Sequence, residues 1–271
     1  MPTISISTAS LFMENALQQV GVPDTNAAQI AEVVLDSELR GHPDHGLFFF
    51  RSVVNWHKPY DAINPKPKTR ITKDAKLFTV IDGDQGCGVI GMNWAMDLSV
   101  PKAKDLGMAA ASITNSANVI ALAPFVQRAA DEGLIAFACS GFRYPLMPPV
   151  GGTSSRFGTN PIDYAAPTGK HPPFLLDFST AAIAVAKVLE AAKYRDPISA
   201  GLVEYADDRP LTDTSDFKLG SSLILPMAGV KGYGLAMMVD MFANVVGDSD
   251  WGISSGFSTH LNSSQSTGFA V

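Results

Sequence analysis

The chain has 271 residues, of which 46% are hydrophobic and 17% are charged, and its formal net charge is -6 at pH 7. These values are typical of a globular protein with one large or two closely packed domains. The negative charge is spread along the chain without a basic stripe, so we expect no nucleic-acid partner.

The start of the chain lacks a charged region followed by an apolar run, and no segment approaches about 18 uninterrupted apolar residues. We therefore expect a cytoplasmic protein with no membrane partner. Cys87 and Cys139 match neither a disulfide framework nor a zinc site, and are expected to be buried apolar side chains. His57, His171 and His260 stand alone without metal-ligand spacing, so no metal site is predicted.

Apolar spacing and capping residues predict three helices at the start of the chain, over Thr8 to Gln19, Asp24 to Arg40 and Leu47 to His57. The prolines of residues 64–67 then predict an extended linker, because proline removes a backbone donor. We place a domain boundary near residue 72. Residues 1–72 thus form a helical N-terminal segment, which we expect to pack with residues 231–271.

Strands and helices are predicted to alternate beyond this boundary, which favours an α/β arrangement in layers. The predicted order is strand Phe78 to Ile81, helix Asn93 to Lys104, strand Met108 to Thr114, helix Ala121 to Asp131 and strand Ile135 to Cys139. A long loop over 140–161 follows, and then strand Phe174 to Asp177, helix Thr180 to Ala192, a short strand at 223–225 and helix Lys231 to Val246. Residues 73–230 are predicted to form an α/β cofactor-binding region.

The hexapeptide GCGVIG at residues 86–91 has the GxGxxG pattern that often binds the pyrophosphate of a dinucleotide. It lies between a predicted strand and a predicted helix, as that function requires. The acidic residue expected about 20 positions further on, which would bind the ribose, is absent, because the next strand leads into Thr114-Asn115-Ser116. The pattern is incomplete, and a tight turn over a packed helix explains the glycines equally well.

Several other polar residues are candidates for chemistry, and each has a structural alternative. Asp44 beside His45 is suited to orient an imidazole as a proton donor, although both also fit an exposed helix end. Thr159 and Asn160, in a glycine-rich loop, offer donors to a phosphate or carboxylate, or form a structured turn.

Two further candidates lie at the ends of predicted elements. Lys231 and Gly232 open a helix whose dipole favours anions, or simply begin that helix. Asp177 ends an apolar strand, where α/β proteins often bind ligands, or caps the next helix.

Five stretches together resemble the malate/L-lactate dehydrogenase family, which is distinct from the Rossmann-type lactate dehydrogenases. RGHPDHG is similar to the family's RGxDSHG, and IDGDQGCGVIG to DGxxGxGxxxG. FGTNPIDYAAPT is similar to LGTNPIAxAxP, LLDFSTAAIAVAKV to LDxATSxxAxGKI, and ILPMAGVKGYGLAMMVDMF to LPLGGxKGYGLALMVDLL. The family also includes ureidoglycolate, sulfolactate and cyclic-imine carboxylate enzymes.

This resemblance implies a non-Rossmann fold, a homodimer, and an oxidoreductase that transfers a hydride between NADH or NADPH and a small 2-oxo acid or cyclic imine. It makes GCGVIG a structural turn near the site. By position, the resemblance places His45 close to the nicotinamide and the small-molecule substrate. It also places six residues at or near the cofactor: Thr159, Asn160, Asp177, Ser179, Lys231 and Gly232.

The chain departs from the family pattern at positions that bear on catalysis. Asp44 replaces the serine before the histidine, and the expected arginine falls on Phe49, with Arg51 only nearby. The stretch that resembles NSxHxG has Asn118 in place of its histidine and Ile120 in place of its glycine. Asparagine can hydrogen-bond a carbonyl group but cannot deliver a proton near neutral pH.

Two interpretations follow. In the first, the protein is a reductase in which Asp44 orients His45 as proton donor, Asn118 holds the substrate oxygen, and Arg51 or Arg143 binds a carboxylate. In the second, hydride chemistry has been lost or changed, and the protein binds a ligand or catalyses another reaction. The sequence does not choose between NADH and NADPH.

Overall fold

The computed structural model describes residues 3–55, 63–142, 144–247 and 268–270. Three N-terminal helices come first: α1 (Ile6–Gln19), α2 (Asp24–Leu39) and α3 (Leu47–Val54). The hydroxyl of Ser5 caps α1 by accepting a 3.1 Å hydrogen bond from the Thr8 amide. All three helices were predicted from apolar spacing, and they are present.

The main sheet has seven strands in the order β1-β2-β3-β9-β4-β5-β6. The strands are β1 (Arg70–Asp74), β2 (Phe78–Asp82), β3 (Ala110–Thr114), β4 (Ala136–Cys139), β5 (Pro161–Ala166), β6 (Phe174–Ser179) and β9 (Gly268–Ala270). Strands β2 and β3 pair in parallel, with α4 (Gly88–Leu106) between them in the chain. The other neighbouring pairs are antiparallel.

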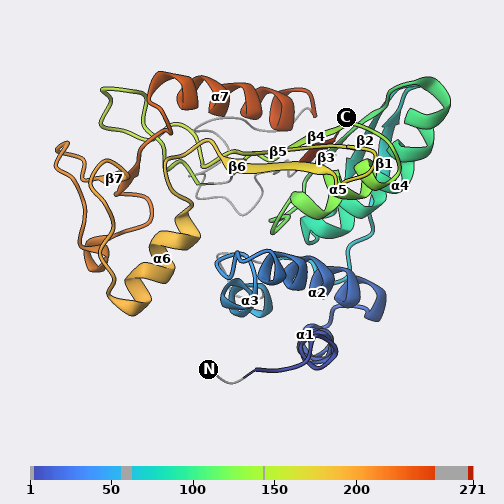
Figure 1. Cartoon of the computed structure of the whole chain (residues 1–271), viewed down its shortest axis with the longest axis horizontal. Coiled ribbons are helices and arrows are strands. Elements are labelled where there is room, and N and C mark those ends of the chain that lie inside the picture. The colour runs from blue at the N-terminus through green and yellow to red at the C-terminus, as the bar shows by residue number, and fades with distance from the viewer. Residues whose placement is uncertain (1–2, 56–62, 143, 248–267, 271) are drawn as a thin grey trace.

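Helices cover both faces of the sheet (Figure 1). On one face, α4 and α5 (Ala123–Asp131) pack with the N-terminal helices in the largest hydrophobic cluster, which includes Ile30 of α2, Ile113 of β3 and Ala165 of β5. On the other face, α7 (Val230–Asp240) and the following π-helical turn (Met241–Val245) pack on Ile162 of β5. Strand alternation explains why Ile162 and Ala165 point to opposite faces.

A smaller lobe lies beside β5 and β6 and has its own apolar cluster around Leu146, Val203 and Leu211. It contains α6 (Val185–Tyr194), the two-stranded sheet of β7 (Val203–Glu204) and β8 (Leu223–Ile224), and a 3-10 turn (Thr214–Asp216). This lobe stands at one end of the sheet, with α6 reaching toward α2 and α3 (Figure 1).

Alternation of strands and helices is confirmed, but the organisation expected from the sequence differs in two respects. Strand β1 spans the boundary proposed near residue 72, and the N-terminal helices share one core with α4 and α5. Helix α7 and the π-helical turn cover the face of the sheet opposite to the three N-terminal helices (Figure 1), and β9 lies within the sheet. Both expected buried cysteines are buried and free.

The GCGVIG hexapeptide forms the tight turn that leads into α4, and its glycines are required by close packing. A Cβ on Gly86 would lie 2.5 Å from Cγ of Pro67, and one on Gly91 would lie 2.7 Å from Cγ2 of Ile113. A Cβ on Gly88 would lie 2.6 Å from the carbonyl oxygen of Ala117. The glycines therefore allow close packing against neighbouring side chains and backbone, in agreement with the structural turn that the family resemblance implies.

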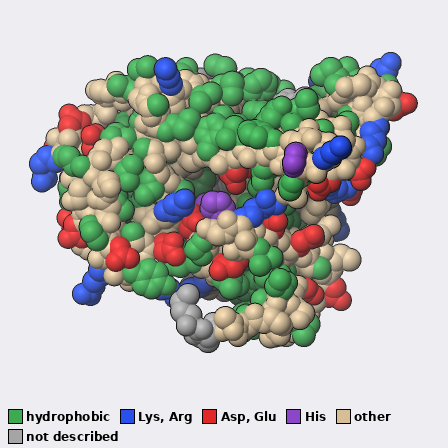
Figure 2. Space-filling model, in the orientation of Figure 1, with side chains coloured by type: hydrophobic (Ala, Val, Ile, Leu, Met, Phe, Trp, Pro, Cys, Tyr) green, Lys and Arg blue, Asp and Glu red, His purple; other side chains and the backbone are tan. Residues whose placement is uncertain are grey.

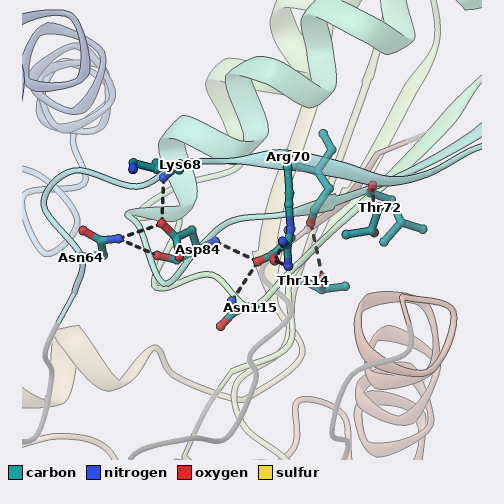
Figure 3. Close-up of polar contacts among 10 residues, drawn as sticks. Asn64, Lys68, Arg70, Thr72, Asp84, Thr114 and Asn115 are labelled. Carbon is teal, nitrogen blue, oxygen red and sulfur yellow. Dashed lines mark hydrogen bonds and ion pairs between the residues drawn. The ribbon is translucent and has the colours of Figure 1, made fainter.

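Polar contacts hold this turn against the extended segment before β1 (Figure 3). Nδ2 of Asn64 donates to the carboxylate of Asp84 at 2.9 Å, and the amide of Lys68 donates to the same carboxylate at 2.8 Å. Nδ2 of Asn115 donates to Asp82 at 2.8 Å. The turn thus fixes the linker on one side and the segment after β3 on the other.

We predict that Gly88→Ala lowers the free energy of unfolding by about 1–3 kcal/mol, because the added methyl group meets backbone atoms that cannot rotate away. Urea denaturation measures the change. Gly234→Ala in α7 is the matched control, since a Cβ there has no neighbour within 4 Å among the described residues. The control should gain about 0.5–1 kcal/mol as a normal helix substitution. Equal stability of the two variants would contradict this explanation of Gly88.

Candidate active site

A cavity of about 510 Å³ lies between α2, the loop that follows it, strands β5 and β6, and the start of α6. Its apolar lining includes Val119, Ile120 and Leu122. Its polar and charged lining comes from α2, the α2–α3 loop, β5, β6 and α6. Figure 2 shows histidine, basic and acidic side chains gathered around a hollow between the sheet and the N-terminal helices.

Asp44 and His45 lie at this cavity, in the loop between α2 and α3. Nδ1 of His45 is 2.9 Å from Oδ2 of Asp44, which is only 2% exposed, whereas the His45 side chain is 36% exposed. A carboxylate only accepts hydrogen bonds, so Nδ1 of a neutral His45 carries the hydrogen and Nε2 is left free to exchange a proton. The sequence prediction that Asp44 orients His45 matches this geometry.

Electrostatics keep Asp44 ionised. Burial alone would raise the pKa of the Asp44 carboxyl, but the hydrogen bond to His45 and the positive charges of His45 and Lys187 outweigh that cost. The pKa of Asp44 therefore lies below its usual value of 3.8. Asp44 is thus a fixed negative charge behind the imidazole.

The local backbone sets this pair in place. Helix α2 ends at Leu39, and Gly41 adopts a φ of 84°, the left-handed conformation that glycine permits at a helix end. The amide of His42 then donates to the carbonyl oxygen of Ser37, and that of His45 donates to the carbonyl oxygen of His42. The chain turns sharply here, which directs residues 42–45 back to the cavity.

On the strand side, Thr159, Asp177 and Ser179 line the same cavity, as their predicted role near a cofactor requires. The hydroxyl of Ser179 donates to the carbonyl oxygen of Thr159 at 2.9 Å, which ties the start of β5 to the end of β6. Asp177 is exposed at the cavity, and partial desolvation by the surrounding protein raises its pKa, although positive charge on His42, His45 and Arg40 opposes this. These residues and the Asp44–His45 pair come together from distant parts of the sequence.

Three other predicted cofactor residues lie outside the cavity lining. The amide of Asn160 is fully buried: it donates to the carbonyl oxygen of Ala236 at 2.9 Å and accepts from the Phe142 amide at 3.1 Å. Gly232 lies so close to Met227 that a Cβ would be 2.1 Å from its carbonyl oxygen. Lys231 is exposed on the first turn of α7, the helix on the opposite face of the sheet.

Asn118 is also outside the lining, and its Oδ1 accepts a 2.6 Å hydrogen bond from the amide of Ile120. That bond stabilises a turn in which Ile120 has a φ of 70°. A glycine would adopt this conformation without strain, which explains the glycine of the NSxHxG motif, whereas a β-branched residue is disfavoured there. The side chain of Ile120 nevertheless lines the cavity and is 5% exposed, so it gains burial in return.

The structure does not bring the predicted carboxylate-binding arginines to the cavity. Arg51 lies exposed on α3 and is not part of the lining, and Arg143 lies outside the described residues. Instead, the cavity is lined by charged residues that the sequence did not predict as site residues: Asp36, Arg40, His42, Asp163 and Lys187. Arg40, His42 and Lys187 all lie within the motif stretches quoted above, so a signal for them was present; Asp163 replaces an alanine of its motif.

Among the residues that the structure describes, no group of three or more His, Cys, Asp or Glu is arranged to hold a metal ion. The described helices include none that is long and apolar enough to span a membrane.

Comparison with known proteins gives the family. The model of the malate/L-lactate dehydrogenase family matches residues 4–270, and the chain therefore belongs to this family. L-sulfolactate dehydrogenase of Methanocaldococcus jannaschii is 36% identical over 234 residues, which are 86% of this chain and 66% of that protein. Hydroxycarboxylate dehydrogenase B of Escherichia coli K12 is 29% identical over 269 residues, 97% of this chain and 72% of that protein.

Solved structures confirm the fold. A putative malate/lactate dehydrogenase from Escherichia coli superposes with a TM-score of 0.90 at 26% identity, covering 100% of this chain and 76% of that one. Sulfolactate dehydrogenase of Methanocaldococcus jannaschii gives a TM-score of 0.81 at 29% identity, covering 99% and 77%. The chain spans 66% to 68% of the length of the first curated relatives. The non-Rossmann α/β fold expected from the motifs is thus confirmed.

We predict that Asp44→Asn lowers the free energy of unfolding by about 2 kcal/mol at pH 7, because a buried hydrogen bond to a charged partner is lost. Since the pKa of Asp44 is lower in the folded than in the unfolded chain, its contribution is complete above about pH 5 and is lost as pH falls through the folded pKa. Urea denaturation between pH 7 and pH 3 should therefore show the two proteins converging at acid pH.

Asp105→Asn, an exposed change on α4, controls for the loss of one negative charge and should cost little at any pH. A stability difference for Asp44→Asn that stays constant down to pH 3 would mean that packing, rather than charge, explains the effect.

Proposed function

We propose that the protein is an NAD(P)-dependent oxidoreductase that transfers a hydride between NADH or NADPH and a small substrate. The substrate class is a 2-oxo acid and its 2-hydroxy acid, or a cyclic imino acid. The observation that carries this proposal is the Asp44–His45 pair, at 2.9 Å, on the wall of a cavity that Thr159 and Asp177 also line. Membership of a family of dehydrogenases supports it.

The cavity suits a nicotinamide cofactor in size and chemistry. Its volume of about 510 Å³ falls within the usual range for small-molecule and cofactor sites. Part of its lining is apolar, from Val119 to Leu122, and another part carries the hydroxyls and carboxyls of β5, β6 and the residues before β5. A flat ring with polar substituents requires such a combination of apolar and polar lining. When bound, the nicotinamide supplies or accepts the hydride.

The residues of this chain then have distinct tasks in the proposal. His45 gives a proton from Nε2 to the oxygen of a 2-oxo acid, or to the nitrogen of an imine, during reduction and takes it back during oxidation. Asp44 holds the ring in that tautomer and stabilises the imidazolium that forms in the oxidation direction. Thr159, Asp177 and Ser179 contact the cofactor, while Asn160 and Gly232 act by positioning β5 and α7 through their internal contacts.

The remaining assignments are extensions of the same proposal. Asn118 stabilises the turn that presents Val119 and Ile120 to the cavity. A contact of its side chain with a substrate oxygen rests on the sequence alone. Arg40 and Lys187, which line the cavity, are better placed than Arg51 to attract a substrate carboxylate. The cofactor role of Lys231 and the homodimeric state rest on the family resemblance. The carboxylate role of Arg143 and the cytoplasmic location rest on the sequence alone.

We predict that His45→Ala lowers kcat by at least about 100-fold, the usual contribution of a general acid or base, while the Kd for NADH or NADPH changes less than about threefold. Steady-state assays with pyruvate, oxaloacetate and cyclic imino acids measure the first effect, and a fluorescence titration measures the second. His171→Ala, at an exposed histidine of the β5–β6 loop, should leave both unchanged. Unaltered turnover in His45→Ala would refute the role of His45.

A further inference from the structure

Asp163 is a buried acid that the proposed function does not use. It lies in the middle of β5, where the family motif LGTNPIAxAxP has an alanine. The residue is 1% exposed, it lines the cavity, and its Oδ1 has no hydrogen-bond partner within the described part of the chain. Leaving a carboxyl oxygen buried without a partner costs free energy, so such an atom indicates a missing contact.

A second carboxyl lies beside it. Asp163 of β5 and Asp177 of β6 are directly opposite each other in the antiparallel register, and both line the cavity. Directly opposed residues have Cβ atoms about 5 Å apart and project from the same face of the sheet. The two carboxyls therefore share one part of the cavity wall.

The positive charges around this pair do not bind its carboxyls directly. Arg40 makes hydrogen bonds to both carboxylate oxygens of Asp36. The buried carboxylate of Asp44 is paired with His45 and is also stabilised by the charge of Lys187. Among the described residues, no cationic side chain forms an ion pair or hydrogen bond with the carboxyl of Asp163 or Asp177. The described part of the chain thus supplies neither acid with a direct counter-ion.

The pKa values of Asp163 and Asp177 agree with the lack of a direct counter-ion among the described residues. Burial raises the pKa of Asp163 well above its usual value, and the negative charge of Asp177 raises it further, while Arg40 only partly opposes this. Partial desolvation also raises the pKa of Asp177, which is more exposed than Asp163. The other titratable groups around the pair are Asp36, Arg40, His42, Asp44, His45 and Lys187 at the cavity, and Cys139 on β4.

We propose that Asp163 and Asp177 bind a cationic nitrogen of the ligand, an ammonium or a protonated imine, and that Asp163 makes the site specific for nitrogen-containing substrates. Within the described chain, the acid pair lacks a hydrogen-bond donor to Oδ1 of Asp163 and a direct counter-ion. A cation with N–H groups supplies both, because it donates hydrogen bonds and neutralises charge. A hydroxyl group, from a ribose or a hydroxy acid, supplies the hydrogen bond only. This inference rests on the proposed function and narrows its substrate class to the cyclic imino acids and their amine products.

Isosteric ligands test the inference directly. Piperidine-2-carboxylate carries a ring ammonium, and oxane-2-carboxylate has a ring oxygen in the same place. Titration calorimetry of the full chain with saturating NAD+ or NADP+ should show the nitrogen compound binding at least about tenfold more tightly, as expected for a charge-assisted hydrogen bond. Binding of the ammonium should also release protons from the acid pair, detected as a heat that depends on the buffer.

Asp163→Asn should reduce the preference for nitrogen to less than about threefold and remove the proton release, with cofactor affinity unchanged. Asp163→Ala restores the residue of the family motif and gives a second test should the Asn variant fold poorly. Asp97→Asn, at an exposed acid of α4, is the control and should behave as the parent protein.

The stability of the ligand-free protein provides an independent measurement. Because the folded pKa of Asp163 is raised, its stabilising contribution exists only at low pH and is lost as pH rises through that pKa. At pH 7, the melting temperature of Asp163→Asn should therefore equal or exceed that of the parent protein. Any difference in melting temperature should vanish below about pH 4. A lower melting temperature at pH 7 would assign Asp163 a structural role and overturn the inference.

Failure of the inference is distinct from failure of the proposed function. Cofactor binding with equal affinity for the two ring compounds would overturn the cation site while leaving the oxidoreductase intact. Absence of NADH and NADPH binding in a fluorescence titration would overturn the proposed function and the inference with it. Preference for nitrogen that persists undiminished in both Asp163 variants would also overturn the assignment.

Discussion

The antiparallel pairing of β5 with β6 is the constraint on which the site depends. Its register places Asp163 opposite Asp177 and brings the end of β6 to the start of β5. There the carbonyl oxygen of Thr159 accepts a hydrogen bond from the Ser179 hydroxyl. A shift by one residue would turn these side chains to the α7 face. The cavity chemistry therefore follows from strand register, with α2 and its loop providing the opposite wall.

Charge placement across this cavity follows a simple rule. The acid on the loop, Asp44, has a partner in His45 and a lowered pKa, whereas the acids on the strands, Asp163 and Asp177, have raised pKa values. One side thus holds an ionised carboxylate behind a base, and the other holds acids that favour a proton or a cation. Perturbed pKa values of this kind cluster at functional sites.

Family motifs and apolar periodicity predict the fold class and several of the cavity residues, but they do not give the face of the sheet on which each residue lies. Lys231 and Gly232 belong to a specific motif, yet α7 carries them to the side opposite His45. Strand β5 was not predicted, because it follows a long glycine- and proline-rich loop and has a buried acid at its centre. Strand β1 was missed because all five of its residues are exposed.

The central claim is that the cavity between α2 and the β5–β6 pair is the cofactor and substrate site. A crystal structure with bound NADH or NADPH tests it most directly. The account predicts that the nicotinamide lies in this cavity against His45, and that the turn at residues 86–91 makes no contact with the pyrophosphate. A pyrophosphate bound at that turn, or a cofactor bound away from His45, would contradict it.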